Sequence, residues 1–144
     1  MVPRRLPHVL TRKDFAVVVA PTYAAAANVD FDEALERMER ALAAPRVLDA
    51  LYQGLAGALR ERESARTTED ELLDKLSAGV QKRRSRVKAA ALSPALSAAM
   101  VMLNLEIGYA PEMMRNALAE PKGQKLLEQG LKELGAHLLK ELIK

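Results

Sequence analysis

The chain has no cysteine and no tryptophan, and its only histidines are His8 and His137. The absence of cysteine excludes disulfides, thiolate nucleophiles and thiolate metal ligands. It is also typical of a reducing compartment, so we predict a cytoplasmic protein. Aromatic residues make up 3% of the chain, which leaves few platforms for stacking on single-stranded nucleic acid. Because the sequence motifs of common hydrolases, phosphate-binding loops and zinc sites are missing as well, we predict no catalytic residue, no cofactor and no metal ion.

Long apolar runs are also missing. The longest nearly uncharged stretch, residues 89–106, includes polar residues such as Ser93 and is shorter than the roughly 20 apolar residues of a membrane span. Near the N-terminus, Arg12 and Asp14 interrupt the sequence before FAVVVA, which is too short for the apolar region of a signal peptide. We therefore predict neither a membrane span nor a signal peptide.

Apolar residues, mainly Ala and Leu, make up 49% of the 144 residues. Both residue types favour helices, and this length suits one domain with one core. Apolar spacing and proline positions predict an all-α fold, a compact bundle of five or six helices. A central apolar helix is expected at about 94–108 and an amphipathic C-terminal helix at about 121–143. Residues 1–10 are expected to form an N-terminal arm and residues 11–144 a single helical domain.

The N-terminal third contains the one ambiguous element. Pro3 and Pro7 indicate an arm that is ordered only if another part of the protein holds it. The FAVVVA sequence at 15–20 is rich in β-branched residues, but no second strand-like run exists to pair with it, so a helix is favoured. A strand paired with another chain remains the alternative. Pro21 is expected to end this element.

Capping residues predict the next helix boundaries. Asp30 is expected to accept a hydrogen bond from the amide near Glu33, and Pro45 suits the first turn of a second helix. These two segments are expected to form a helical hairpin or one helix kinked at Pro45. Thr68 and Glu71 form a second capping pattern, which begins the helix that leads into the basic segment.

The basic segment QKRRSRVK, residues 81–88, is the only concentration of charge, and cationic side chains supply most of the affinity for nucleic-acid phosphates. On a helix, Lys75, Lys82 and Arg86 share one side while Arg84 and Lys88 lie nearly opposite. A solvated helix end is one interpretation, and a recognition helix after Gly79 is another, weaker one. The predicted contacts to a partner or to phosphates are Lys82, Arg83, Arg84, Arg86 and Lys88.

Four methionines, Met100, Met102, Met113 and Met114, gather near Gly108. Flexible thioethers fill irregular gaps in a core and also suit adaptable partner grooves, so these residues are the predicted groove. The function prediction is a noncatalytic helical interaction or regulatory protein that binds a protein partner through this groove and the basic surface. The alternative is a small nucleic-acid-binding accessory protein, in which Arg4 and Arg5 also contact phosphates.

A homodimer is the second partner prediction. Its two expected seams are the leucine stripe of the last helix and the small residues around Gly54. Gly135 lies within the leucine stripe and predicts a close helix crossing.

Three polar groups have both a structural and a functional interpretation. The first-turn acids Asp30, Asp32 and Glu33 suit helix capping better than a hard-metal site. Asn104 and Glu106 suit a cross-helix hydrogen bond and a helix end better than an active site. The third group is Glu133, His137 and Glu141, which share one helix face. This arrangement suits a solvated surface better than a metal site.

Overall fold

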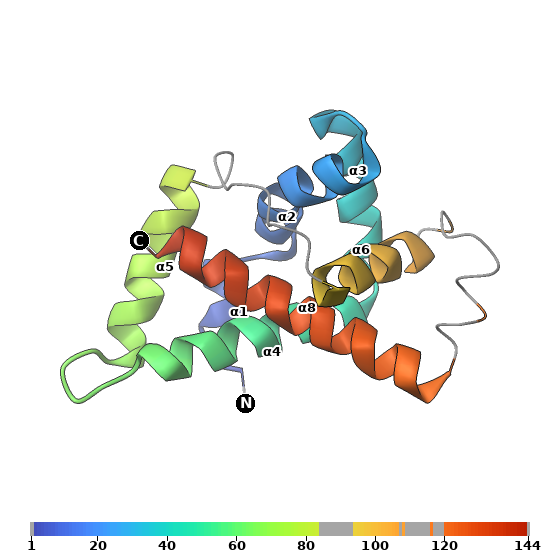
Figure 1. Ribbon diagram of the computed structural model, residues 1–144. Coiled ribbons are helices and arrows are strands. Elements are labelled where there is room, and N and C mark those ends of the chain that lie inside the picture. Colours follow the sequence, from blue (N-terminus) through green and yellow to red (C-terminus); the bar gives the residue numbers. More distant parts are fainter. Residues whose placement is uncertain (1, 84–93, 107, 109–115, 117–119, 144) are drawn as a thin grey trace.

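The protein is all helical in the part of the chain that the computed structural model describes, which is residues 2–83, 94–106, 108, 116 and 120–143. No strand occurs among these residues, so the predicted all-α class is confirmed (Figure 1). The described residues form seven helices rather than the five or six expected, and the shortest, at Leu6–Val9, is a single turn. The helices that the sequence places at about 94–108 and 121–143 lie close to those positions. The elements are α1 (Leu6–Val9), α2 (Arg12–Ala27), α3 (Phe31–Ala41), α4 (Pro45–Arg62), α5 (Glu69–Arg83), α6 (Pro94–Glu106) and α8 (Pro121–Leu142).

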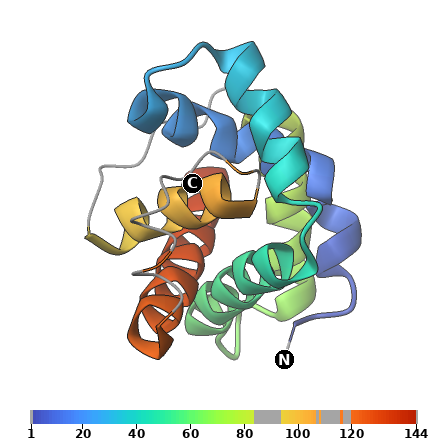
Figure 2. The same ribbon diagram turned by 90° about the vertical axis from the view of Figure 1, so that its right-hand side faces the viewer.

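The longest helix, α8, packs against α4 on one side and α6 on the other, as both views show (Figures 1 and 2). Burial of its apolar stripe drives this packing, because each buried leucine side chain contributes about 1.5–3 kcal/mol of transfer free energy. α6 also contacts α2 and α3 and so links α8 to the N-terminal half. The buried stripe of α8 consists of Leu127, Leu131, Leu134, Leu138 and Leu142.

Helix α2 continues through Pro21, so the prediction that this proline ends the element is wrong. An interior proline removes one backbone hydrogen bond and clashes with the preceding turn. The helix nevertheless continues because side chains on both sides of the proline, including Phe15 and Tyr23, are fully buried. The helix begins at a reciprocal cap, in which the Thr11 and Asp14 side chains bond to each other's backbone amides. The prediction of helix for 15–20 is confirmed.

The capping predictions for the next helices are confirmed. Asp30 Oδ1 accepts a hydrogen bond from the Glu33 amide at 2.8 Å, and the Thr68 hydroxyl accepts one from the Glu71 amide at 3.3 Å. Pro45 begins α4. Neither a kinked helix nor a hairpin of α3 and α4 forms, since α3 packs chiefly on α2. Ala44 is extended, as the residue before a proline prefers, and this redirects the chain.

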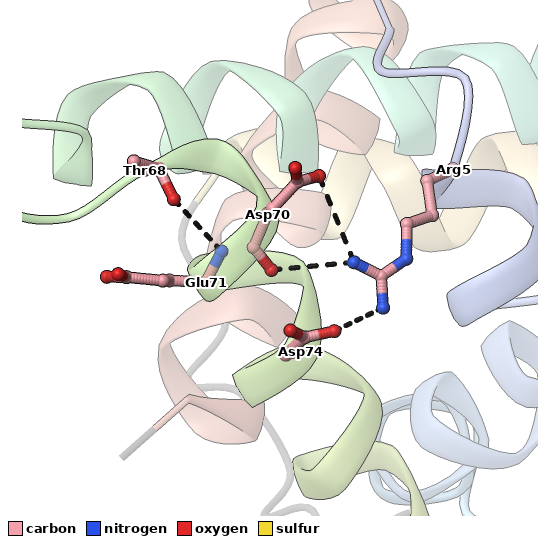
Figure 3. A network of polar contacts seen from close by, with 5 residues as sticks. All are labelled: Arg5, Thr68, Asp70, Glu71 and Asp74. Atoms are coloured by element: carbon pink, nitrogen blue, oxygen red, sulfur yellow. Dashed lines mark hydrogen bonds and ion pairs between the residues drawn. The ribbon is translucent and has the colours of Figure 1, made fainter.

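The N-terminal arm is held against the body of the protein. Leu6 and Leu10 are fully buried, and the Tyr52 hydroxyl donates a hydrogen bond to the Leu10 carbonyl oxygen at 2.7 Å. The guanidinium of Arg5 forms ion pairs with Asp70 and Asp74 on α5 (Figure 3). The hydrogen bond to Asp74 raises the pKa of Arg5 above its ordinary value. These contacts order the arm and allow one helical turn, α1, to form.

Helices α4 and α8 cross through two glycines. A Cβ atom added to Gly54 would lie 2.1 Å from the Lys132 carbonyl oxygen, and one added to Gly135 would lie 2.5 Å from the Leu51 carbonyl oxygen. Neither distance is sterically allowed, so only glycine lets the two backbones approach this closely. The close crossing predicted at Gly135 is confirmed. The two seams expected for a homodimer therefore pack against each other within one chain, and the homodimer remains a prediction that neither seam supports.

Candidate partner-binding surfaces

A basic cleft of about 520 Å³ lies where the ends of α4 and α8 meet α5. Its polar lining consists of three cationic side chains, Arg62 from α4 and Lys75 and Lys82 from α5. None of the described residues that line it is acidic. The remaining lining residues are small or apolar: Ala78, Gly79, Leu142 and Ile143.

The sequence of α5 explains how the cleft forms. Lys75 and Lys82 are seven residues apart and therefore lie on the same side of the helix, with Ala78 and Gly79 between them. A Cβ atom at Gly79 would lie 1.8 Å from the Leu142 carbonyl oxygen, so the end of α8 packs directly on this glycine. The adjoining side of α5 faces the protein core, through the buried residues Leu72, Leu73, Leu76 and Val80.

The positive charge of the basic cleft is only partly explained by structural roles. Arg62 Nη1 donates a hydrogen bond at 3.1 Å to the carbonyl oxygen of Ile143, just beyond α8, where a cation complements the helix dipole. Lys82 is the last but one residue in the described part of α5, and Lys75 lies in the middle of that part. Both lysines are exposed, and neither forms an ion pair with a residue that the structure describes.

The basic cleft contains one residue of the predicted basic surface. Lys82 lies at the cleft, whereas the side chain of Arg83 and all of Arg84, Arg86 and Lys88 lie outside the described residues. Helical spacing correctly predicts that Lys75 and Lys82 share a side. The sequence gives no signal for Arg62, because α4 and α5 are brought together only by the tertiary fold.

Of the four methionines predicted to form a groove, Met100 is the one whose side chain the structure describes. This residue is 5% exposed and lines a groove of about 210 Å³ between α2 and α6, together with Tyr23, Ala26, Ala27, Ser97, Val101 and Asn104. The side chain of Met102 and all of Met113 and Met114 lie outside the described residues. Met100 therefore contributes to the core and to the floor of a small groove at the same time.

A polar network beside this groove joins α2, α3 and α6. The Tyr23 hydroxyl donates a hydrogen bond to Asn104 Oδ1 and accepts one from Arg37 Nη1 at 3.0 Å. Arg37 also pairs with Glu33 at 2.7 Å. The hydrogen bond to Tyr23, with a further contribution from Glu33, raises the pKa of Arg37. The cross-helix hydrogen bond predicted for Asn104 is confirmed, and these groups have a structural role; the Glu106 side chain lies outside the described residues.

A third cleft, of about 440 Å³, lies between α4, α6 and α8 and has charges of both signs. Glu61 and Glu133 line it together with Arg62 and Lys140. His137 also lines it, and its Nε2 atom is buried without a hydrogen-bond partner among the described residues. Within the described ranges, no group of three or more acidic or histidine side chains has the arrangement of a metal site.

None of the described helices combines the length and apolar character that a membrane crossing requires. Comparisons with models of known protein families, with curated proteins and with solved structures find no match to this chain. The functional argument therefore depends on the surfaces themselves.

Proposed function

We propose that this protein is a noncatalytic interaction protein that binds an acidic segment of a protein partner in the basic cleft. The observation that supports this function is the concentration of three cations on two helices, with no carboxylate side chain among the described residues that line the cleft. A segment carrying carboxylates would pair with these cations. Electrostatic complementarity of this kind speeds association and selects the partner.

The residues that line the basic cleft favour a protein partner over a nucleic acid. Its lining includes apolar residues at the end of α8 and Ala78 on α5, which suit the apolar side chains of a peptide. The scarcity of aromatic residues removes the usual means of stacking nucleic-acid bases. Arg5, which the nucleic-acid hypothesis requires as a phosphate contact, is already paired with Asp70 and Asp74.

Direct binding of two defined probes tests this proposal. We would titrate the full chain with a fluorescent helical peptide of Glu, Leu and Ala, and separately with a short labelled DNA duplex. The double variant Lys75→Glu/Lys82→Glu should weaken peptide binding by about 100-fold, because two attractive contacts become repulsive. The matched control is Lys122→Glu/Lys125→Glu, which makes the same charge change on exposed residues of α8 that do not line the basic cleft.

The outcomes separate the two partner classes. Peptide binding that is lost in the cleft variant and kept in the control supports a protein partner. Equal peptide binding by both variants contradicts the proposal. Tighter binding of DNA, with an affinity that falls steeply with the logarithm of salt concentration, would replace it with the nucleic-acid function.

A further inference from the structure

We infer that the acidic segment recognised by the basic cleft is present in the protein itself, on α3 of a second copy. This inference rests on the proposed function and specifies its partner. The recognised surface is an acidic ridge that consists of Asp32, Glu36 and Glu39. The contact would join different surfaces of two identical chains.

The acidic ridge is a free and well-defined surface. Its residues are spaced at i, i+4 and i+7 and are exposed, while Ala34, Met38 and Ala41 on the opposite side of α3 are buried. The neighbouring acids already have structural roles, since Asp30 caps the helix and Glu33 pairs with Arg37. The ridge carboxylates, in contrast, form no ion pair or hydrogen bond with any described residue.

The spacing of the acidic ridge matches the spacing of the basic cleft. Asp32 and Glu39 are seven residues apart, as are Lys75 and Lys82. With a rise of 1.5 Å per residue, both pairs span about 10.5 Å. Two helices laid alongside each other would therefore bring both lysines opposite carboxylates at once. Glu36, in the middle of the ridge, would then face the part of the cleft between the two lysines, and Arg62 adds a third cation to the cleft lining.

The contact cannot form within one chain. Figure 1 shows α3 and α5 on different sides of the molecule, with α2 between them. A ridge-to-cleft contact therefore joins one copy to the next and leaves a free ridge and a free cleft at the ends. Such a head-to-tail contact produces a ring or an open chain of copies rather than a two-fold dimer.

Sedimentation equilibrium of the full chain at rising concentration tests this inference. At low salt, the average mass should rise above the 15.8 kDa of one chain, and at high salt it should return to that value. Two variants should each stay at the mass of one chain at low salt: Lys75→Glu/Lys82→Glu, with a reversed cleft, and Asp32→Lys/Glu39→Lys, with a reversed ridge. An equimolar mixture of these two variants should associate again, because each reversed surface then meets its complement.

Matched controls exclude an effect of net charge alone. Lys122→Glu/Lys125→Glu and Asp49→Lys/Glu120→Lys change the same number of exposed charges on residues that neither form the ridge nor line the cleft, and both variants should associate like the original protein. Circular dichroism of each variant verifies that the helices are retained. The inference is overturned if the original protein stays at 15.8 kDa at every concentration in low salt, or if the mixed variants do not associate. If the acidic peptide still binds the cleft in that case, the proposed function stands and only the identity of the partner is wrong.

Discussion

Helix α8 meets its neighbours through glycine at two places with very different surroundings. In its middle, Gly135 lies against α4, whose Gly54 lies in turn against the backbone of Lys132. At its end, the backbone of Leu142 lies against Gly79 of α5. The first crossing is surrounded by buried leucines, whereas the second opens into the basic cleft.

This difference shows that a close backbone approach can serve two purposes. In the middle of α8, apolar stripes continue on both sides of the glycine, so close approach completes the core. At the end of α8 the apolar stripe stops, and the lysines on α5 border the contact. A glycine in close contact with a neighbouring backbone therefore forms part of the apolar core in one place and borders the basic cleft in the other. Four sets of variants test this comparison.

The largest effect is expected at the α4–α8 crossing. Gly54→Ala or Gly135→Ala should lower the free energy of unfolding by at least about 3 kcal/mol, since the new methyl group meets backbone that no rotamer change can move. Urea unfolding measures the change. The matched control is Gly57→Ala in the same helix, where nothing lies within 4 Å of an added Cβ atom. That variant should gain roughly 0.5–1 kcal/mol from helix propensity. Unchanged stability of Gly54→Ala would contradict the close crossing.

Tyr52 lies on the same helix as Gly54, and the pH dependence of stability tests whether its hydroxyl is buried. Tyr52→Phe leaves the Leu10 carbonyl oxygen without its donor and should cost about 1–3 kcal/mol near neutral pH. Burial, with a smaller contribution from the charge of Asp14, raises the pKa of Tyr52 from 10.0 to about 12.

The direction of the pH effect follows from this raised pKa. The folded protein keeps the phenolic proton at pH values where the unfolded chain has lost it, so Tyr52 stabilises the fold fully below pH 10. This stabilisation is lost as the pH rises towards 12. The difference in unfolding free energy between the original protein and Tyr52→Phe should therefore shrink over that interval. A difference that stays constant from neutral pH to pH 12 would refute the burial of this hydroxyl.

A smaller effect is expected at the second glycine contact. An added methyl group at Gly79 meets the Leu142 carbonyl oxygen, but this is the last residue of α8 and its end can shift more easily than its middle. Ala also gains about 1 kcal/mol of helix propensity over Gly, so the net change for Gly79→Ala should stay within about 1 kcal/mol. Urea unfolding alongside Gly54→Ala measures the contrast. Equal losses in the two variants would remove the distinction between the two contacts.

The smallest effect is expected at the ion pairs that hold the N-terminal arm on α5. Arg5→Ala should lower the melting temperature only slightly, because exposed ion pairs add little to stability and the buried Leu6 and Leu10 still hold the arm. The difference from the original protein should disappear at high salt. Arg4→Ala is the control, since Arg4 is exposed and forms no ion pair among the described residues. A large loss for Arg5→Ala would mean that charge, not burial, orders the arm.

Helix positions were largely predictable, because caps and prolines act over a few neighbouring residues. Asp30 and Pro45 begin helices where the sequence places them. The prediction that Pro21 ends a helix is wrong because the burial of residues beyond it, which a local pattern does not reveal, compensates for the lost backbone hydrogen bond. The candidate site was predictable in part. Lys82 and its shared side with Lys75 follow from helical spacing, but Arg62 joins them only after α4 and α5 converge.

The amino-acid sequence by itself determined that this chain is helical and which face of each helix is apolar, because both properties depend on neighbours within one or two turns. Tertiary structure alone decided which faces meet. It paired the leucine stripe of α8 with the small-residue face around Gly54 of α4 inside one chain, although the same two faces suited an interface between copies. It also gathered Arg62, Lys75 and Lys82 around one cleft. The physical reason is that a periodic pattern specifies that a face must be covered, whereas the covering surface is selected by contacts between residues far apart in the sequence.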